Sequence, residues 1–260
     1  MRLADQIILI TGSTTGIGEF MARRFVTEGA KVILQGRSAQ RGEAIRKELG
    51  EDKAAFCQGD LADPAYPEQL AQEALAAFGR IDALVNNAAI TVRGRIEDTD
   101  ADFFDRMIAI NTRAPMLLIR ALLPALKESK GCVLNIGSVL AHCGQANMLA
   151  YSMSKGALQT MTRNLADSQG TEGVRFNQLN VGWTLTENEY KVKMEDGLPA
   201  DWPEHVPAYA APAGRVTKPE EVAAATVYWV GRESYPISGT VAELEQYPII
   251  GRYPNMEGDS

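Results

Sequence analysis

The stretch ILITGSTTGIGEFMARRF, residues 8–25, decides the fold of this chain of 260 residues. An apolar run ends at Thr11, three glycines follow at Gly12, Gly16 and Gly18, and an amphipathic segment continues directly from them. A strand, a turn and a helix in this order bring backbone N–H groups and a helix N-terminus to one point, where the missing Cβ atoms let a phosphate approach. The pattern therefore indicates a turn that binds a pyrophosphate. The alternative is a tight turn whose glycines serve backbone geometry alone, and its place in the first strand-helix unit disfavours that interpretation.

Short apolar runs alternate with longer amphipathic segments along the rest of the chain. We predict strands at 6–11, 31–35, 54–58, 82–87, 132–137 and 174–182, and a last strand within TVAELEQY, 240–247. We predict helices at 17–28, 39–49, 64–78, 101–128, 151–169 and 219–231. Continuous apolar runs are typical of parallel strands buried on both faces, and strict alternation implies right-handed crossovers. The expected fold class is α/β, a three-layer Rossmann-like doubly wound parallel sheet in a single domain over residues 1–260.

One segment, 184–214, breaks this alternation. It contains four prolines, at positions 199, 203, 207 and 212, and scattered aromatic residues. Long connections inside compact domains are often functional. We expect a substrate loop or lid here.

Composition narrows the possible partners. The net charge of −7 and the pI near 5.1 disfavour nucleic acid and anionic membranes, because a polyanion requires a basic face. The three cysteines have no C-x-x-C spacing, so we expect no metal site. The glycine-rich turn follows the N-terminus too closely to leave room for a signal peptide, and no run of 18 apolar residues is present. We expect a cytoplasmic protein with a small-molecule substrate.

A tyrosine and a lysine lie four residues apart in AYSMSKGAL, residues 150–158. On a helix, Tyr151 and Lys155 share one face and can present a hydroxyl and an ammonium to one cleft. A free phenol has a pKa near 10, which a neighbouring cation lowers, so that Tyr151 can exchange a proton with an alcohol. Ser138 follows the predicted strand VLNIG and can orient the substrate oxygen. An ordinary contact on a helix face is the alternative, which Ser138 and the glycine-rich turn disfavour.

Several ordered motifs together resemble the short-chain dehydrogenase/reductase family over about residues 5–240. They are TGSTTGIG at 11–18, DL at 60–61, NNAA at 86–89, IN at 110–111, Ser138, and Tyr151 with Lys155. The resemblance implies an NAD(P)-dependent oxidoreductase whose catalytic residues are Asn111, Ser138, Tyr151 and Lys155. In that family pattern Lys155 also holds the nicotinamide ribose, and Asn111 anchors a water chain. The resemblance further implies a homotetramer or homodimer packed through 101–128 and 151–169.

The end of the second predicted strand, VILQGRS at 32–38, bears on the choice of nucleotide. Gly36 stands where an acidic residue would bind a ribose, and Arg37 follows it. We therefore favour NADP(H), with Arg37 as the phosphate ligand and Ser38 as a second donor. NAD(H) remains open, because Arg37 could instead cap the turn or stack on adenine.

The family pattern supplies the remaining cofactor contacts. It implies that Asp60 and Leu61 bind adenine, that Asn87 and Ala88 line its ribose, and that Thr184 and Thr186 contact the nicotinamide and phosphates. The full expected set is Gly12, Ser13, Thr15, Gly16, Ile17, Gly18, Arg37, Ser38, Asp60, Leu61, Asn87, Ala88, Tyr151, Lys155, Gly182, Thr184 and Thr186. The chain departs from the family at Val181, where a proline is common, and near Glu243 and Glu245, where an Asp-Gly-Gly close is usual.

The substrate is the least determined part. Candidate pocket residues are His142, Gln145, Trp183 and Asn188, and polar neighbours favour a sugar or polyol as the secondary alcohol or its carbonyl. One alternative is a 3-oxoacyl thioester reductase, although an acidic chain suits an acidic carrier protein poorly. Another is a non-catalytic NADP(H)-binding regulator, which has no physical need for Ser138, Tyr151 and Lys155.

Overall fold

The computed structural model describes residues 1–250 and contains one sheet of seven parallel strands. In spatial order the strands are β3 (Ala54–Gln58), β2 (Lys31–Gly36), β1 (Ile7–Ile10), β4 (Ala83–Asn86), β5 (Cys132–Ser138), β6 (Arg175–Val181) and β7 (Val241–Leu244). The direction of progression reverses between β1 and β4. Doubly wound sheets bind ligands at the carboxyl ends of their strands beside such a reversal. The predicted fold class and the predicted last strand are confirmed.

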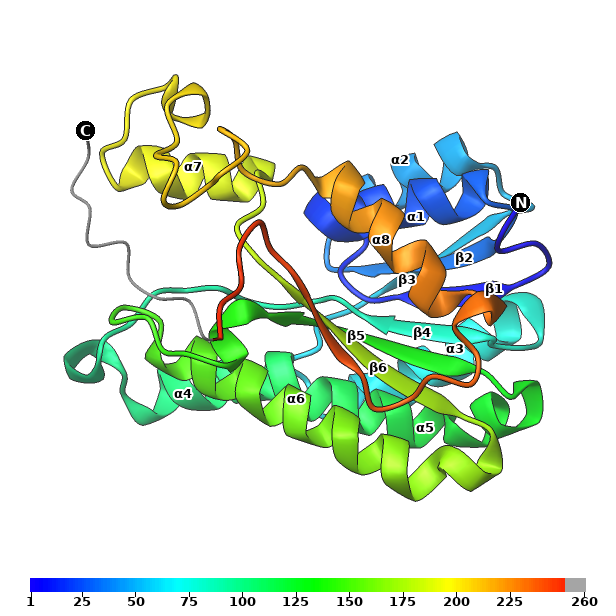
Figure 1. Cartoon of the computed structure of the whole chain (residues 1–260). Coiled ribbons are helices and arrows are strands. Elements are labelled where there is room, and N and C mark those ends of the chain that lie inside the picture. The colour runs from blue at the N-terminus through cyan, green and yellow to red at the C-terminus, as the bar shows by residue number, and fades with distance from the viewer. Residues whose placement is uncertain (251–260) are drawn as a thin grey trace.

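Helices cover both faces of the sheet (Figure 1). One layer contains α1 (Gly16–Thr27), α2 (Ala39–Leu49) and α8 (Pro219–Val230), and the other contains α3 (Tyr66–Phe78), α5 (Ala114–Ser129) and α6 (Leu149–Gln169). Successive strand residues point to opposite faces. In β1, Ile8 and Ile10 accordingly enter the core under α1, whereas Ile7 and Leu9 enter the core under α3 and α5. Because both faces of the sheet are buried, the sequences of its strands are continuous apolar runs.

The helix predicted at 101–128 is present, but a π-helical turn interrupts its regular α-helical hydrogen bonding. The structure has α4 (Ala101–Ile108), a π-helical turn η2 (Ala109–Arg113) and then α5. The side chain of Asn111 accounts for the interruption, because its Oδ1 accepts from the backbone N of Ile90 at 2.9 Å and its Nδ2 donates to the Ile90 carbonyl at 3.0 Å. Turns of this kind are frequent at functional sites.

The segment 184–214 also contains structure that the sequence did not predict. It includes α7 (Glu187–Glu195) and the short helix η5 (Trp202–Glu204), and it projects from the sheet edge in Figure 1. Trp202, Val206, Ala211 and Val216 form a small core of its own there. Four further short helices are η1 (Ile96–Asp98), η3 (Val139–Ala141), η4 (Gly170–Glu172) and η6 (Arg232–Ser234). Within residues 1–250, no helix is long and apolar enough to cross a membrane.

A chain of polar side chains crosses the buried middle of the sheet, between β4, β5, β6 and α6. Asn86 donates to Asn135 at 2.8 Å, and Asn135 donates to Thr162 at 2.8 Å. Thr162 contacts Gln178 Oε1 at 3.0 Å, and Gln178 donates to Asn180 at 2.7 Å. All five residues are at most 3% exposed. Buried polar groups are tolerated when they are hydrogen-bonded in this way.

Candidate active site

The glycine-rich turn is packed too closely for side chains. A Cβ atom on Gly12, whose φ is +63°, would lie 2.8 Å from the Cα of Ala88. A Cβ on Gly18 would lie 2.6 Å from Asn87 Nδ2 and would also overlap the Gly12 carbonyl. Asn87 Nδ2 donates to the carbonyls of Thr11 and Gly12 at 2.9 and 3.1 Å. The segment after β4 therefore fixes the turn.

The hydroxyl and the backbone N–H of Ser13 both form hydrogen bonds inside the protein. Ser13, expected at the cofactor, is fully buried; its hydroxyl donates to the Ile10 carbonyl at 2.8 Å and accepts from Gln35 N at 3.0 Å. Its own N–H donates to the Gln35 carbonyl at 2.9 Å. Both polar groups of Ser13 thus shape the turn instead of facing a ligand. By contrast, Thr15 begins α1 without a side-chain cap, so the first N–H groups of that helix lack intrahelical and capping partners.

The end of β2 presents two arginines. Arg37 is exposed, and its guanidinium has no partner within residues 1–250. Ser38 caps α2 by accepting from Arg41 N at 3.3 Å. Arg41, which sequence reasoning missed, is exposed on the first turn of α2, and its charge adds to the larger effect of Lys191 in lowering the pKa of Glu187 on α7. The sequence signal that could have pointed to Arg41 is that it follows Arg37 by only four residues.

The end of β3 carries Asp60 and Leu61. Asp60 is exposed, and its Oδ1 accepts from Ala62 N at 2.9 Å. Leu61 is 6% exposed, and Arg113 donates to the Ala62 carbonyl at 2.7 Å. The second carboxylate oxygen of Asp60 has no hydrogen-bond partner in the described part of the chain, so it is free to accept from a ligand.

Tyr151 and Lys155 occupy one face of the first turns of α6, with Ser138 at the carboxyl end of β5. All three side chains are buried, at 9%, 3% and 7% exposure respectively. Lys155 Nζ donates to the carbonyl of Ile136 at 2.8 Å and lies 5.7 Å from the centre of the Tyr151 ring. The structure therefore brings the three predicted groups to the sheet edge.

Burial dominates the acid–base properties of this pair. It raises the pKa of Tyr151 to about 12; the Ser138 hydroxyl opposes this rise, and the charge of Glu189 adds to it. Burial also lowers the pKa of Lys155 to about 8. Without a bound cofactor, burial therefore outweighs the other influences on the Tyr151 pKa, and its lowering by Lys155 together with an oxidised nicotinamide stays a prediction.

Asn111 lies behind the pair rather than beside it. Its Nδ2 donates to Ser154 Oγ at 3.0 Å, and Ser154 Oγ donates to the Tyr151 carbonyl at 2.7 Å. Through these bonds the π-turn holds the first turn of α6 in place. The water chain expected at Asn111 stays a prediction.

The chain after β6 crosses the carboxyl edge of the sheet. Gly182 leaves no room for a Cβ beside the carboxylate of Glu245, which accepts from Trp183 N at 3.1 Å. Thr184 is buried, at 7% exposure. Thr186 caps α7 by accepting from Glu189 N at 3.1 Å. Its methyl group would lie 3.7 Å from a Cβ on Gly16, so the N-terminus of α7 meets the glycine-rich turn.

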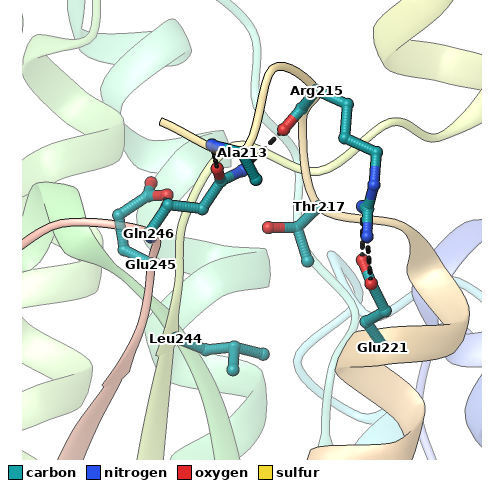
Figure 2. Close-up of a pocket in the computed structure, with 7 residues that line it drawn as sticks. All are labelled: Ala213, Arg215, Thr217, Glu221, Leu244, Glu245 and Gln246. Atoms are coloured by element: carbon teal, nitrogen blue, oxygen red, sulfur yellow. Dashed lines mark hydrogen bonds and ion pairs between the residues drawn. The ribbon is translucent and has the colours of Figure 1, made fainter. Parts of the chain in front are cut away.

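Glu245 also borders a cavity of about 300 Å³ at the end of β7 (Figure 2). Gln246 crosses it by accepting from Ala213 N at 2.9 Å and donating to the Arg215 carbonyl at 2.7 Å. The lining residues are Ala213, Arg215, Thr217, Glu221, Leu244, Glu245 and Gln246. The sequence did not predict any of them as site residues. The chain lacks the Asp-Gly-Gly sequence that is usual in the family near Glu243 and Glu245, so the resemblance implied no role for its C-terminal part.

The four expected substrate residues lie in different surroundings. His142 Nε2 lies 3.0 Å from Asn180 Nδ2 and 3.3 Å from Glu243 Oε1, so neighbouring side chains occupy it. Trp183 stacks on Trp202 with ring centres 5.5 Å apart, inside the small core of 184–214. Gln145 and Asn188 are exposed. His142 and Trp183 each contact a buried side chain, and the role of all four residues at a substrate stays a prediction.

Comparison with known proteins agrees with this geometry. The short chain dehydrogenase family matches residues 6–196. An L-fucose dehydrogenase of Mus musculus is 32% identical over 237 residues, 90% of this chain and 85% of the relative. A meso-2,3-butanediol dehydrogenase of Serratia marcescens is 30% identical over 239 residues, 92% of each chain.

A solved structure is similar over nearly the whole length. The 3-ketoacyl-(acyl-carrier-protein) reductase of Brucella melitensis, complexed with NADH, superposes with a TM-score of 0.82 at 29% identity and covers 93% of this chain and 97% of that one. The chain belongs to the short chain dehydrogenase family. It is an NAD(P)-dependent oxidoreductase that acts on a small molecule.

Proposed function

We propose that the protein is an NADP(H)-dependent dehydrogenase that interconverts a secondary alcohol and its carbonyl, with a sugar or polyol as substrate. The observation that carries the proposal is the buried cluster of Ser138, Tyr151 and Lys155 at the carboxyl edge of β5. The sugar and diol named for the two relatives, L-fucose and meso-2,3-butanediol, support a hydroxylated substrate.

The cluster divides the proton chemistry among three groups. A bound nicotinamide cofactor supplies the hydride for reduction or accepts it in oxidation. With a pKa of about 12, the Tyr151 phenol is protonated at neutral pH and can donate its proton to the oxygen of a carbonyl undergoing reduction. In the reverse direction the Tyr151 oxygen takes the alcohol proton. Ser138 orients the reacting oxygen, and Lys155 is held by Ile136 where its charge stabilises the phenolate.

Replacing Tyr151 by phenylalanine tests this assignment. Because the phenol is the only proton donor that we place at the reacting oxygen, kcat for a panel of polyols should fall by about 10³ or more. NADPH binding should persist, measured by fluorescence titration. Tyr228→Phe, on α8 far from the cluster in sequence and layer, is the control that should retain activity. Comparable turnover by Tyr151→Phe and the wild type would refute the proposal. A wild type that binds NADPH and turns over no alcohol would instead favour a non-catalytic NADP(H)-binding regulator.

The fit of a dinucleotide rests on the packing of the turn and on the free groups around it. The close approaches at Gly12 and Gly18, the uncapped start of α1 and the free oxygen of Asp60 suit a pyrophosphate and an adenosine. We propose that Thr15, Gly16, Ile17, Asn87, Ala88, Gly182, Thr184 and Thr186 complete the contacts. Ser13 acts through the shape of the turn.

The preference for NADP(H) is assigned to Arg37 and Arg41. Arg37 directly follows β2 and Arg41 lies on the first turn of α2, both exposed, and no carboxylate follows Gly36 to repel a 2′-phosphate. Arg37→Ala should reduce a preference for NADPH over NADH by about tenfold, roughly 1.4 kcal/mol, in fluorescence titrations. Arg232→Ala, at the far end of α8, is the matched control. Equal binding of both nucleotides by the wild type would point to an NAD(H) enzyme.

A 3-oxoacyl thioester reductase is the second candidate, favoured by the likeness to the Brucella melitensis structure. Rates with acetoacetyl-coenzyme A and with polyols under identical conditions separate the two candidates. A preference for the thioester of tenfold or more in kcat/KM would select the reductase.

Assembly and compartment stay proposals. We expect a homodimer or homotetramer packed through α4, α5 and α6, where Met116 is 42% and Met153 is 51% exposed. Charged substitutions of both residues should shift the mass measured by light scattering to a smaller species. We also propose that 184–214 acts as a lid and that the enzyme works in the cytoplasm.

A further inference from the structure

Charged side chains of the lid segment lie opposite a loop that is anchored beside Tyr151. The anchor is backbone pairing: Gly94 N donates to the Asn147 carbonyl at 2.9 Å, and Leu149 N donates to the Gly94 carbonyl at 3.3 Å. Residues 147–149 lead directly into Tyr151. Arg93, next to Gly94, is therefore fixed near the catalytic tyrosine.

Helix α7 spans from the glycine-rich turn to this arginine. Its N-terminal cap, Thr186, approaches Gly16, and Asp196 at its C-terminal end forms an ion pair with Arg93. The pair is partly buried, with side-chain exposures of 29% for Arg93 and 32% for Asp196. The helix thus bridges the cofactor side and the Tyr151 side of the site.

Glu189, on the first turn of α7, is the acidic group of this helix that bonds to the segment after β6. Its Oε1 accepts from the indole of Trp183 at 2.8 Å and lies 3.8 Å from Lys193 Nζ. Trp183 follows Val181, the register partner of Ser138 across β5 and β6, by two residues. The other oxygen, Oε2, has no hydrogen-bond partner anywhere in residues 1–250, and the side chain is only 27% exposed.

Glu189 lies on α7 between the two contacts that tie this helix to the site, Thr186 at Gly16 and Asp196 at Arg93, and its electrostatic effects agree with that position. Its charge contributes to the raised pKa of Tyr151, after burial, which is the main cause. It also contributes to the raised pKa of Arg93, after the larger effect of Asp196. A free carboxylate oxygen at that position is a strong acceptor for a hydroxyl group.

We propose that Glu189 is a specificity-determining residue, whose free oxygen accepts a hydrogen bond from a hydroxyl on the carbon next to the one that is oxidised. This inference rests on the proposed alcohol dehydrogenase activity. It selects vicinal diols and sugars over simple secondary alcohols. A site built to bond a substrate hydroxyl rejects the analogue that lacks it, because the buried acceptor is then left unpaired. Substrates with a carboxylate at that carbon are repelled.

The test compares two alcohols that differ by one hydroxyl, meso-2,3-butanediol and 2-butanol, in the wild type and in Glu189→Gln. Glutamine keeps an acceptor for the Trp183 indole, so the helix should stay in place. The wild-type ratio of kcat/KM for diol over mono-alcohol should fall by about tenfold or more in the variant, as loss of a charged hydrogen bond requires. Glu195→Gln, the same change at an exposed position of α7, should leave the ratio unchanged.

A pH profile supplies a readout that a purely structural role would not move. Because the Glu189 charge raises the pKa of Tyr151, its removal should shift the acidic limb of the oxidation rate to lower pH. An unchanged diol ratio in Glu189→Gln, with wild-type activity intact, would overturn the inference alone. A wild type that oxidises neither these alcohols nor a wider polyol panel would overturn the proposed function, and the inference with it.

Discussion

The glycine-rich turn and the segment 184–214 meet at the sheet edge, where Gly16 approaches Thr186, yet they are held in different ways. The turn is fixed by hydrogen bonds from the Asn87 side-chain amide to two of its carbonyls and by contacts that leave no space for one added carbon. The segment is fixed by a small aromatic core and by ion pairs such as Arg93 with Asp196.

This difference separates two tasks within one site. A rigid turn suits a ligand whose pyrophosphate is always the same, because preorganised groups lose little freedom on binding. A segment held by side chains near the surface opens at lower cost, as the passage of substrate and product requires. The contrast predicts that equivalent changes in the two regions have unequal effects.

The largest expected effect is that of Gly18→Ala. The new Cβ would overlap the Gly12 carbonyl and press on Asn87, and neither backbone nor anchored amide can move away. The free energy of unfolding should fall by about 3 kcal/mol or more, at the upper end for overpacking, and NADPH binding should weaken. Urea denaturation and nucleotide titration measure the two changes.

Gly197→Ala in the lid segment is the matched control. Nothing lies within 4 Å of the new Cβ, and only the positive φ of +90° opposes the change. We expect a loss of about 1 kcal/mol with unchanged NADPH binding. Equal losses of unfolding free energy in Gly18→Ala and Gly197→Ala would contradict the difference in rigidity between the turn and the lid segment.

Lys155→Met should remove activity yet stabilise the protein. Burial lowers the Lys155 pKa from 10.5 to about 8, so the buried ammonium opposes folding by roughly 3 kcal/mol at neutral pH. This cost is fully present below pH 8. It disappears as pH rises to 10.5, because only the unfolded chain then still binds the proton.

The stability difference between Lys155→Met and the wild type should accordingly shrink between pH 8 and pH 10.5, as followed by urea denaturation at each pH. Lys191→Met, at an exposed position of α7, is the control and should show no such dependence. A variant less stable than the wild type at pH 7 would show that the contact with Ile136 outweighs burial.

The smallest expected effect is that of Arg93→Ala. An ion pair that solvent still reaches contributes little to stability, so Tm should hardly change, whereas KM should rise about two- to fivefold as α7 loses its anchor. Added salt should raise the wild-type KM in the same way and leave the variant unaffected. A KM indifferent to both changes would show that the ion pair does not hold the lid.

Much of the fold was predictable because its strands are buried on both faces and separated by amphipathic helices. The π-turn at Asn111 was not, since a helical pattern continues through it and the cause is a side chain bonded to the distant Ile90. Helix α7 was not predictable from the sequence, because none of its residues is buried and it carries no apolar stripe. Its cap Thr186 and acidic first turn were the only local signals.

In the candidate site, too, the residues fixed by local pattern were predictable and those fixed by distant contacts were not. Tyr151, Lys155 and Ser138 were predictable because helix spacing and strand ends fix their positions. The partners of His142 and Trp183 were not, because they come from β6, β7 and the lid segment, which no local pattern connects. The direction of the Tyr151 pKa depends on burial, which spacing cannot reveal.

The amides that cross the sheet bear on how the strands find their alignment. Asn86, Asn135 and Gln178 are direct neighbours in the pairing of β4, β5 and β6. A strand shifted by one residue would turn its amides into the opposite helix layer, where each unpaired group costs about 1–3 kcal/mol. Purely apolar strands would pack almost equally well after such a shift. These side chains therefore make the observed alignment of the strands more stable than a shifted one, and the geometry of the active site at their carboxyl ends depends on that alignment.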